Sequence, residues 1–160
     1  MPPADRRRRR HAGADGVSQR PGRDELLTAL IIDAYDALAD TAEAADAGRP
    51  PADIRGRWEA TCHAVRDRAL AHPHEYALIY GSPLAGYQAP QATVAPATRV
   101  ADAIAPGVPE AMIARLLIAW TQLFGMISFE LFGQLVGSAD PADAFFGYAV
   151  GQMADFIGLP

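Results

Sequence analysis

One short stretch restricts the fold of this chain more than any other: residues 71–83, AHPHEYALIYGSP. Pro73 stands where a helix can begin, and Gly81-Ser82-Pro83 ends the helical pattern about two turns later. A charged helical pattern precedes the stretch, and a long apolar helical pattern follows it. A short aromatic helix between two longer ones has to be enclosed by them, so we expect it to form part of the wall of an internal cavity.

Apolar residues recur at three- and four-residue spacing along most of the chain, which is typical of amphipathic helices. Pro and Gly residues separate the patterns, and neither strand alternation nor an internal repeat is present. The sequence therefore predicts an all-α fold of about six helices, over residues 24–47, 54–71, 73–80, 91–105, 109–136 and 141–157. We expect the fifth helix to be the longest. We expect the charged residues of the second helix to lie mostly on its outer face: Arg55, Arg57, Glu59, Arg66 and Asp67.

Charge divides the chain into two parts. Residues 1–23 hold seven Arg and two acidic residues, whereas residues 24–160 hold seven Arg and seventeen acidic residues. The first part has too few apolar side chains to offset the entropy of ordering it, so we expect a disordered basic tail. Its Arg6–Arg10 run could touch phosphate non-specifically, but a solvated tail or a start-site artefact is the favoured interpretation. Residues 24–160 form the predicted helical domain, whose acidic balance makes it a poor nucleic-acid surface.

Cysteine use and hydropathy indicate a cytoplasmic protein. The single Cys62 excludes an intrachain disulfide and suits a reducing compartment. No apolar segment follows the Arg run as a secretory signal would require. The apolar run 111–137 could be mistaken for a membrane span, but it carries Arg115, Gln122 and Glu130. We therefore favour a buried helix of a soluble dimer and expect no membrane partner.

The last two helical patterns are apolar on more than one face. A helix of this kind is either central to its domain or shared with another chain. Two such helices from each of two subunits would form a four-helix homodimer interface, and plain core packing is the alternative. The predicted interface residues are Ile127, Leu131, Phe132, Leu135, Phe145, Phe146, Tyr148 and Met153.

Residues capable of metal binding or catalysis occur near the short helix, but their spacing is unfavourable. Cys62 and His63 are adjacent on a helix, so their side chains point about 100° apart. His72 and His74 lack the four-residue spacing of paired helical ligands, and only Glu75 adds a carboxylate. Catalytic motifs for nucleophiles, phosphates and dinucleotides are missing. The sequence predicts no cofactor, no metal site and no enzymatic activity.

The remaining chemistry is that of an aromatic pocket. Residues from three helices could converge on a small, mostly apolar ligand, with close packing as the alternative. The predicted pocket residues are Trp58, Cys62, Tyr76, Tyr80, Trp120 and Phe124.

Two motifs in this chain resemble those of a known family. Residues 72–83, HPHEYALIYGSP, and residues 120–133, WTQLFGMISFELFG, resemble the C-terminal regulatory domain of TetR-type transcriptional repressors. The branch they resemble most is the WHG domain, with Trp58, His72 and Gly81 in the places of its Trp, His and Gly. The resemblance covers about residues 22–160. It implies an all-helical effector-binding domain that dimerises through its last two long helices.

The resemblance also implies an N-terminal DNA-binding domain with a helix-turn-helix, and here the sequence departs from the family. Residues 22–27, GRDELL, resemble the segment that follows the recognition helix, and only the basic tail precedes them. We therefore expect a truncated regulator that binds DNA only through a missing N-terminal domain. The alternative is an orphan interaction module that forms heterodimers with full-length relatives.

Overall fold

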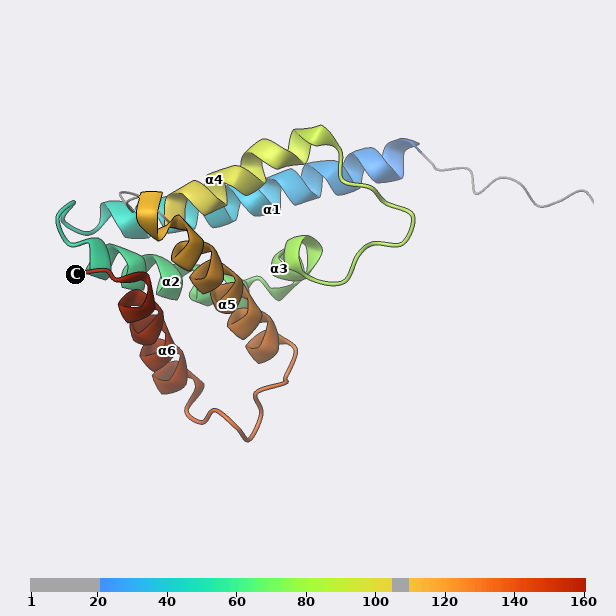
Figure 1. Ribbon diagram of the computed structural model, residues 1–160. Helices are drawn as coiled ribbons and strands as arrows, with labels where there is room; N and C mark the ends of the chain where they lie inside the picture. The colour runs from blue at the N-terminus through green and yellow to red at the C-terminus, as the bar shows by residue number, and fades with distance from the viewer. Residues whose placement is uncertain (1–20, 105–109) are drawn as a thin grey trace, which may run out of the picture.

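The computed structural model describes residues 21–104 and 110–160 as an all-α protein (Figure 1). This confirms the predicted fold class. Short 3-10 turns, η1 at Gln91–Thr93 and η2 at Glu110–Met112, precede the fourth and fifth helices. The α-helices are α1 (Pro21–Ala47), α2 (Ile54–Ala71), α3 (Pro73–Tyr80), α4 (Val94–Ile104), α5 (Ile113–Leu131) and α6 (Ala142–Ile157).

The helices form two groups that meet at α2. In Figure 1, α1 and α4 lie side by side, and α2 packs against α1 on the other side. Helices α5 and α6 form a pair that packs on α2 and extends away from α1. The short α3 lies between α1 and α5, where the sequence predicts an enclosed helix.

The core extends from α1 and α4 into the space between α2, α5 and α6. Its fully buried side chains include Val65 from α2, Leu123 and Ile127 from α5, and Phe146 and Val150 from α6. Each large apolar side chain buried in this way contributes about 1.5–3 kcal/mol relative to an exposed one. The packing of α5 and α6 on α2 is therefore the main source of hydrophobic stabilisation in this half of the molecule.

With the 3-10 turns counted as helical, the helix boundaries differ from the prediction by more than one residue at two places. Helix α1 begins at Pro21, three residues before the predicted start, so residues 21–23 are helical rather than part of a tail. Residues 1–20 of the predicted tail lie outside the described residues. Helix α5 ends at Leu131 and a turn follows over residues 132–138, so α1, with 27 residues, is the longest helix. Gly133 has φ 75°, a left-handed conformation that stops the helix despite the apolar pattern beyond it.

Arg66 is buried, contrary to the prediction that it lies on the outer face of α2. Its side chain is 5% exposed and donates to both carboxylate oxygens of Glu130, at 2.7 and 2.6 Å. It also donates to Asp143 at 2.7 Å, and its guanidinium lies 4.9 Å from the ring centre of Phe146. A helical pattern cannot reveal this pairing, because the two acids come 64 and 77 residues later in the chain.

One described segment, Glu110–Leu131, is long and apolar enough to cross a membrane by length and composition alone. One such helix is weak evidence for a membrane protein. In this structure the segment packs against α2, α3 and α6, and its Glu130 is the partner of Arg66.

Removing Glu130 tests the contribution of the buried ion pair. We expect Glu130→Ala to lower the free energy of unfolding by about 3 kcal/mol, because a buried guanidinium is left with only the exposed Asp143 as partner. Urea unfolding followed by circular dichroism measures this change. The double variant Arg66→Met/Glu130→Leu should recover most of the loss, and Asp67→Asn on the exposed face of α2 should change little. An unchanged stability of Glu130→Ala would contradict this account.

Candidate functional site

Four of the six predicted pocket residues meet in one aromatic cluster between α3 and α5. The ring centres of Tyr80 and Phe124 lie 4.3 Å apart, and those of Trp120 and Phe124 lie 4.9 Å apart. Tyr76 lies 5.2 Å from Tyr80 by the same measure. Tyr35 of α1, which the sequence reasoning missed, meets Tyr80 edge to face at 6.1 Å. These side chains largely pack against one another.

Trp58 and Cys62 are buried in the core, and neither takes part in the ring contacts of this cluster. The indole Nε1 of Trp58 donates to the carbonyl oxygen of Val150 at 3.2 Å. Cys62 is fully buried, and burial raises the pKa of its thiol well above the usual value. Neither residue lines the cavities described below. Both therefore have packing roles in this structure, and Cys62 is held as an unreactive thiol.

Tyr76 ties the short helix α3 to α5. Its side chain is 3% exposed, and its hydroxyl donates to the carbonyl oxygen of Phe124 at 2.9 Å. The hydroxyl also lies 3.0 Å from the Ser128 Oγ. Burial raises the pKa of Tyr76 to about 12, so the phenol keeps its proton at neutral pH.

Gly81 ends α3 at a tight contact. A Cβ at this position would lie 2.3 Å from the carbonyl oxygen of Ala77. Only glycine fits at this position without a clash. The helix therefore ends at Gly81, the residue in the place of the motif's Gly.

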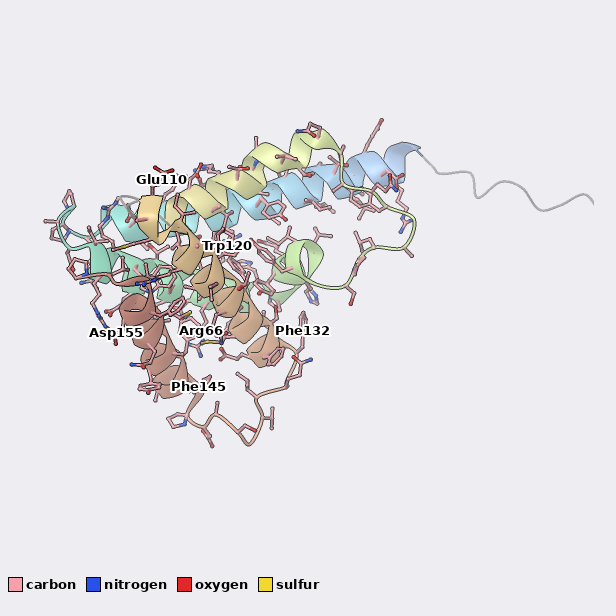
Figure 2. The ribbon with its side chains drawn as sticks, in the orientation of Figure 1. Arg66, Glu110, Trp120, Phe132, Phe145 and Asp155 are labelled. Atoms are coloured by element: carbon pink, nitrogen blue, oxygen red, sulfur yellow. The ribbon has the colours of Figure 1, made fainter. Side chains whose placement is uncertain are left out.

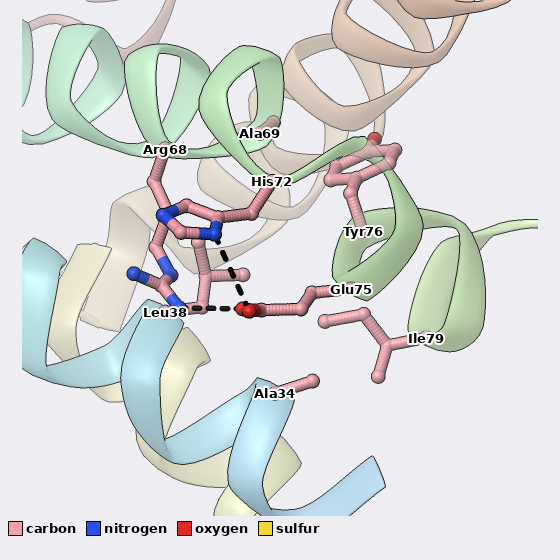
Figure 3. Close-up of a pocket in the computed structure, with 8 residues that line it drawn as sticks. All are labelled: Ala34, Leu38, Arg68, Ala69, His72, Glu75, Tyr76 and Ile79. Carbon is pink, nitrogen blue, oxygen red and sulfur yellow. Dashed lines mark hydrogen bonds and ion pairs between the residues drawn. The ribbon is translucent and has the colours of Figure 1, made fainter. Parts of the chain in front are cut away.

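The end of α2, the helix α3 and the α1 residues Ala34 and Leu38 line a very small cavity of about 10 Å³ (Figure 3). The Glu75 carboxylate lies there 2.5 Å from the Arg68 Nη2 and 3.3 Å from the His72 Nδ1. The carboxylate thus holds the junction of the two helices. Among residues 21–104 and 110–160, no group of three or more His, Cys, Asp or Glu side chains is arranged to hold a metal ion.

A much larger cavity lies between α1, α4 and α5, beside the aromatic cluster. We call it the Tyr35 cleft, and its volume is about 680 Å³. Of the six predicted pocket residues, only Trp120 lines it. Its walls are Tyr35, Thr93, Val94, Ala97, Thr98, Ala101, Asp102, Ile113, Leu116, Leu117 and Trp120. A second cavity of about 310 Å³ under the loop 81–89 shares Tyr35 and Thr93 with it, so Tyr35 stands between two cavities.

A network of ion pairs fixes the wall that α4 contributes to the Tyr35 cleft. Arg99 donates to Glu43 at 2.7 and 2.6 Å and to Asp40 at 2.5 Å, both on α1. It also contacts Asp36 at 3.5 Å. Nothing in the local sequence pattern identifies Arg99 as the common partner of these acids of α1.

The predicted dimer residues divide into exposed and buried groups. Phe132, Phe145 and Tyr148 are 49%, 39% and 68% exposed, and Phe132 and Phe145 lie on the α5–α6 side of the molecule (Figure 2). Ile127 and Phe146, at 0% and 2% exposed, are buried inside the chain and leave no surface for a second chain. Met153 is also buried, and Leu131 and Leu135 are half-buried. Leu135 lies in the turn after α5 rather than on the helix.

A groove of about 320 Å³ runs between α5 and α6 on this side. We call it the α5–α6 groove. Ile118 and Phe156, which are 57% and 46% exposed, line it together with Phe145, Tyr148 and Met153. The sequence reasoning missed Ile118 and Phe156, although their spacing places them on the apolar stripes of the two helices.

Comparisons with known proteins place this architecture in a class of helical regulatory domains. The family model of the Tetracyclin repressor-like C-terminal domain matches residues 58–153. The chain therefore belongs to this TetR-type family.

Relatives with curated descriptions agree with this assignment. The HTH-type transcriptional regulators Rv1816 of Mycobacterium tuberculosis and Mb1846 of Mycobacterium bovis are each 34% identical to this chain over 152 residues. These matches cover 70% of this chain and 63% of each relative, so the chain spans less than two thirds of their length. The relatives are named as regulators rather than enzymes.

A solved structure shows the same fold. The crystal structure of a protein described as a regulatory protein, SCO4313, is 30% identical in sequence and superposes with a TM-score of 0.72. The match covers 84% of this chain and 74% of that one.

Tyr76→Phe tests the link between α3 and α5. We expect a loss of about 1 kcal/mol in the free energy of unfolding, because the hydroxyl's hydrogen bonds are removed while the ring remains. Tyr148→Phe, at a 68% exposed position, is the matched control and should not change the free energy of unfolding.

The raised pKa of Tyr76 predicts a pH dependence of stability. In the unfolded chain the Tyr76 hydroxyl loses its proton near pH 10.0, before the folded chain does, so the free energy of unfolding of the wild type should fall as the pH rises from there towards 12. This fall should be shallower in Tyr76→Phe, and equal slopes in the two proteins would contradict the account.

Proposed function

We propose that this chain is the ligand-sensing and dimerising domain of a TetR-type transcriptional regulator. One observation carries the proposal: α5 borders both the Tyr35 cleft and the α5–α6 groove. Leu117 and Trp120 line the cleft, whereas the intervening residues Ile118 and Ala119 line the groove. A ligand that displaces α5 from the side of the cleft would therefore also move the residues of α5 that line the groove.

The Tyr35 cleft supports the ligand-sensing half of the proposal. Its volume of about 680 Å³ lies within the range of sites for small organic molecules. Its walls are mostly apolar, with one indole and one phenol among them. The predicted pocket is thus proposed in a shifted position, beside the aromatic cluster rather than inside it.

The α5–α6 groove supports the dimerising half. Exposed aromatic and aliphatic side chains gather along both helices, and such a patch on a regulatory domain is typical of a protein interface. A two-fold axis beside the groove would bring four helices together. We propose that its exposed residues, chiefly Ile118, Phe145, Tyr148 and Phe156, carry the contact, and that Ile127, Phe146 and Met153 support it from behind.

Ligand binding would act on DNA through the geometry of the dimer. A ligand in the Tyr35 cleft that favours one position of α5 shifts the equilibrium between two arrangements of the paired subunits. The relatives are named HTH-type regulators, so we propose that DNA is contacted by a helix-turn-helix of that kind. Residues 24–160, with their acidic balance, are not proposed to bind DNA. We propose a cytoplasmic location on the same family grounds.

The dimer interface can be tested by introducing charge into the groove. We expect the wild-type chain to sediment as a dimer at micromolar concentration, and Ile118→Glu/Tyr148→Glu to sediment as a monomer with unchanged helicity. Leu26→Glu places the same change at a 60% exposed position of α1 and should leave the dimer intact.

A wild-type monomer at these concentrations would contradict the homodimer. The same apolar face would then have to pair with a full-length relative, which co-sedimentation with such a relative would detect.

The ligand site can be tested with a neutral aromatic probe, pyrenemethanol. We expect saturable binding of one probe per chain, measured by fluorescence anisotropy, and its loss in Ala97→Trp, where an indole would fill the Tyr35 cleft. Ala95→Trp places the same side chain at an exposed position of α4 that does not line the cleft, and it should bind normally. Equal binding by the two variants would place the probe elsewhere and contradict the proposed site.

A further inference from the structure

The walls of the Tyr35 cleft contain one carboxylate and no cation. Among the residues that the structure describes, Asp102 is the only acidic or basic side chain that lines it, and the adjoining cavity under the loop 81–89 has none. Arg99, the arginine of α4, is bound to the acids of α1 and cannot compensate Asp102. Residues 105–109, APGVP, add no ionisable side chain to the sequence between α4 and α5. An anionic ligand would therefore be repelled by Asp102 and find no cation in the lining to offset that repulsion.

Polar groups of the cleft are available to a ligand. Within the described residues, the Tyr35 hydroxyl, the Trp120 Nε1 and the Asp102 carboxylate have no hydrogen-bond or ion-pair partner. Burial raises the pKa of Tyr35, so its hydroxyl is neutral and adds no second negative charge. The cleft thus offers two donors on aromatic rings and one negative charge.

The length of the cleft and its aromatic lining suit an aromatic ligand. Lining residues of α4 run from Val94 to Asp102, which corresponds to about 12 Å along the helix axis. Trp120 and Tyr35 supply aromatic surfaces, and Val94, Ile113 and Leu117 leave an apolar rim that is 45–60% exposed. Aromatic faces attract cations, and indole does so most strongly.

We propose that the Tyr35 cleft selects flat aromatic ligands that carry a positive charge, with the rings against Trp120 and Tyr35 and the charge beside Asp102. This inference rests on the proposed ligand-sensing function and specifies the class of ligand. Trp120 provides the main contact surface, and Asp102 sets the preference for charge. Neutral aromatic molecules bind more weakly, and carboxylates of the same shape bind weakest.

A series of three probes with one ring system tests the preference. Pyrenemethylammonium, pyrenemethanol and pyrenecarboxylate share the pyrene ring and differ in charge. Each is titrated into the full chain at low salt and followed by fluorescence anisotropy. We expect the ammonium to bind about threefold to fivefold more tightly than the alcohol, because a single exposed carboxylate contributes modestly, and the carboxylate to bind more weakly than the alcohol. Added salt should reduce both differences.

Single substitutions test which residues of the cleft determine the preference for a positively charged ligand. Asp102→Asn should reduce the affinity for the ammonium to that for the alcohol and leave the alcohol unchanged. Asp67→Asn, which removes the same charge from the exposed face of α2, should leave the order intact. Trp120→Leu should weaken all three probes.

The outcomes separate this inference from the proposed function. If the alcohol binds but the carboxylate binds as tightly as the ammonium, or if Asp102→Asn leaves the order unchanged, the charge preference is wrong and the ligand site stands. If none of the three probes binds, both the preference and the ligand-sensing function are overturned.

Discussion

The arrangement of this molecule depends on the ion pair between Arg66 and Glu130. The guanidinium is buried between α2 and α5, contacts both oxygens of Glu130 and reaches Asp143 at the start of α6. One side chain of α2 therefore fixes the last turn of α5 and the first turn of α6. A buried cation tolerates little displacement from its partner, since separation would leave it uncompensated. The last turn of α5 and the start of α6 are accordingly held close to α2.

The middle of α5 is held by a different kind of contact. Tyr76 donates to the Phe124 carbonyl, and Phe124 packs against Tyr80 and Trp120. Phe124 and Ser128, the contacts of Tyr76, lie within two turns of the Arg66 partner Glu130 on the same helix. In the N-terminal half of α5, Ile113 and Leu117 border the Tyr35 cleft and are exposed. A ligand in the cleft therefore meets the less constrained end of a helix whose other end is fixed.

Much of the fold could be predicted because its boundaries are local. Pro73 and Gly81 delimit α3, and Asp53 caps α2 by accepting from the Gly56 amide at 2.9 Å. The end of α5 was placed too late because Gly133 interrupts an apolar pattern that continues to Val136. The ion pairs of Arg66 and Arg99 could not be predicted, since each joins residues more than fifty positions apart. Local periodicity carries no information about such partners.

Five of the six predicted pocket residues do not line the Tyr35 cleft, for a related reason. Large aromatic side chains were taken as pocket walls, but Tyr76, Tyr80 and Phe124 fill space by packing against one another. Interiors pack densely, so a cavity remains where small side chains face a neighbouring helix. Ala97 and Ala101 lie on successive turns of α4 and line the cleft together with Trp120. Their small side chains leave the space between the helices unfilled. The sequence feature that indicates the cleft is thus the face of small residues on α4. Its other wall, Trp120 of α5, comes near only in the folded chain, so the sequence pattern could not show it.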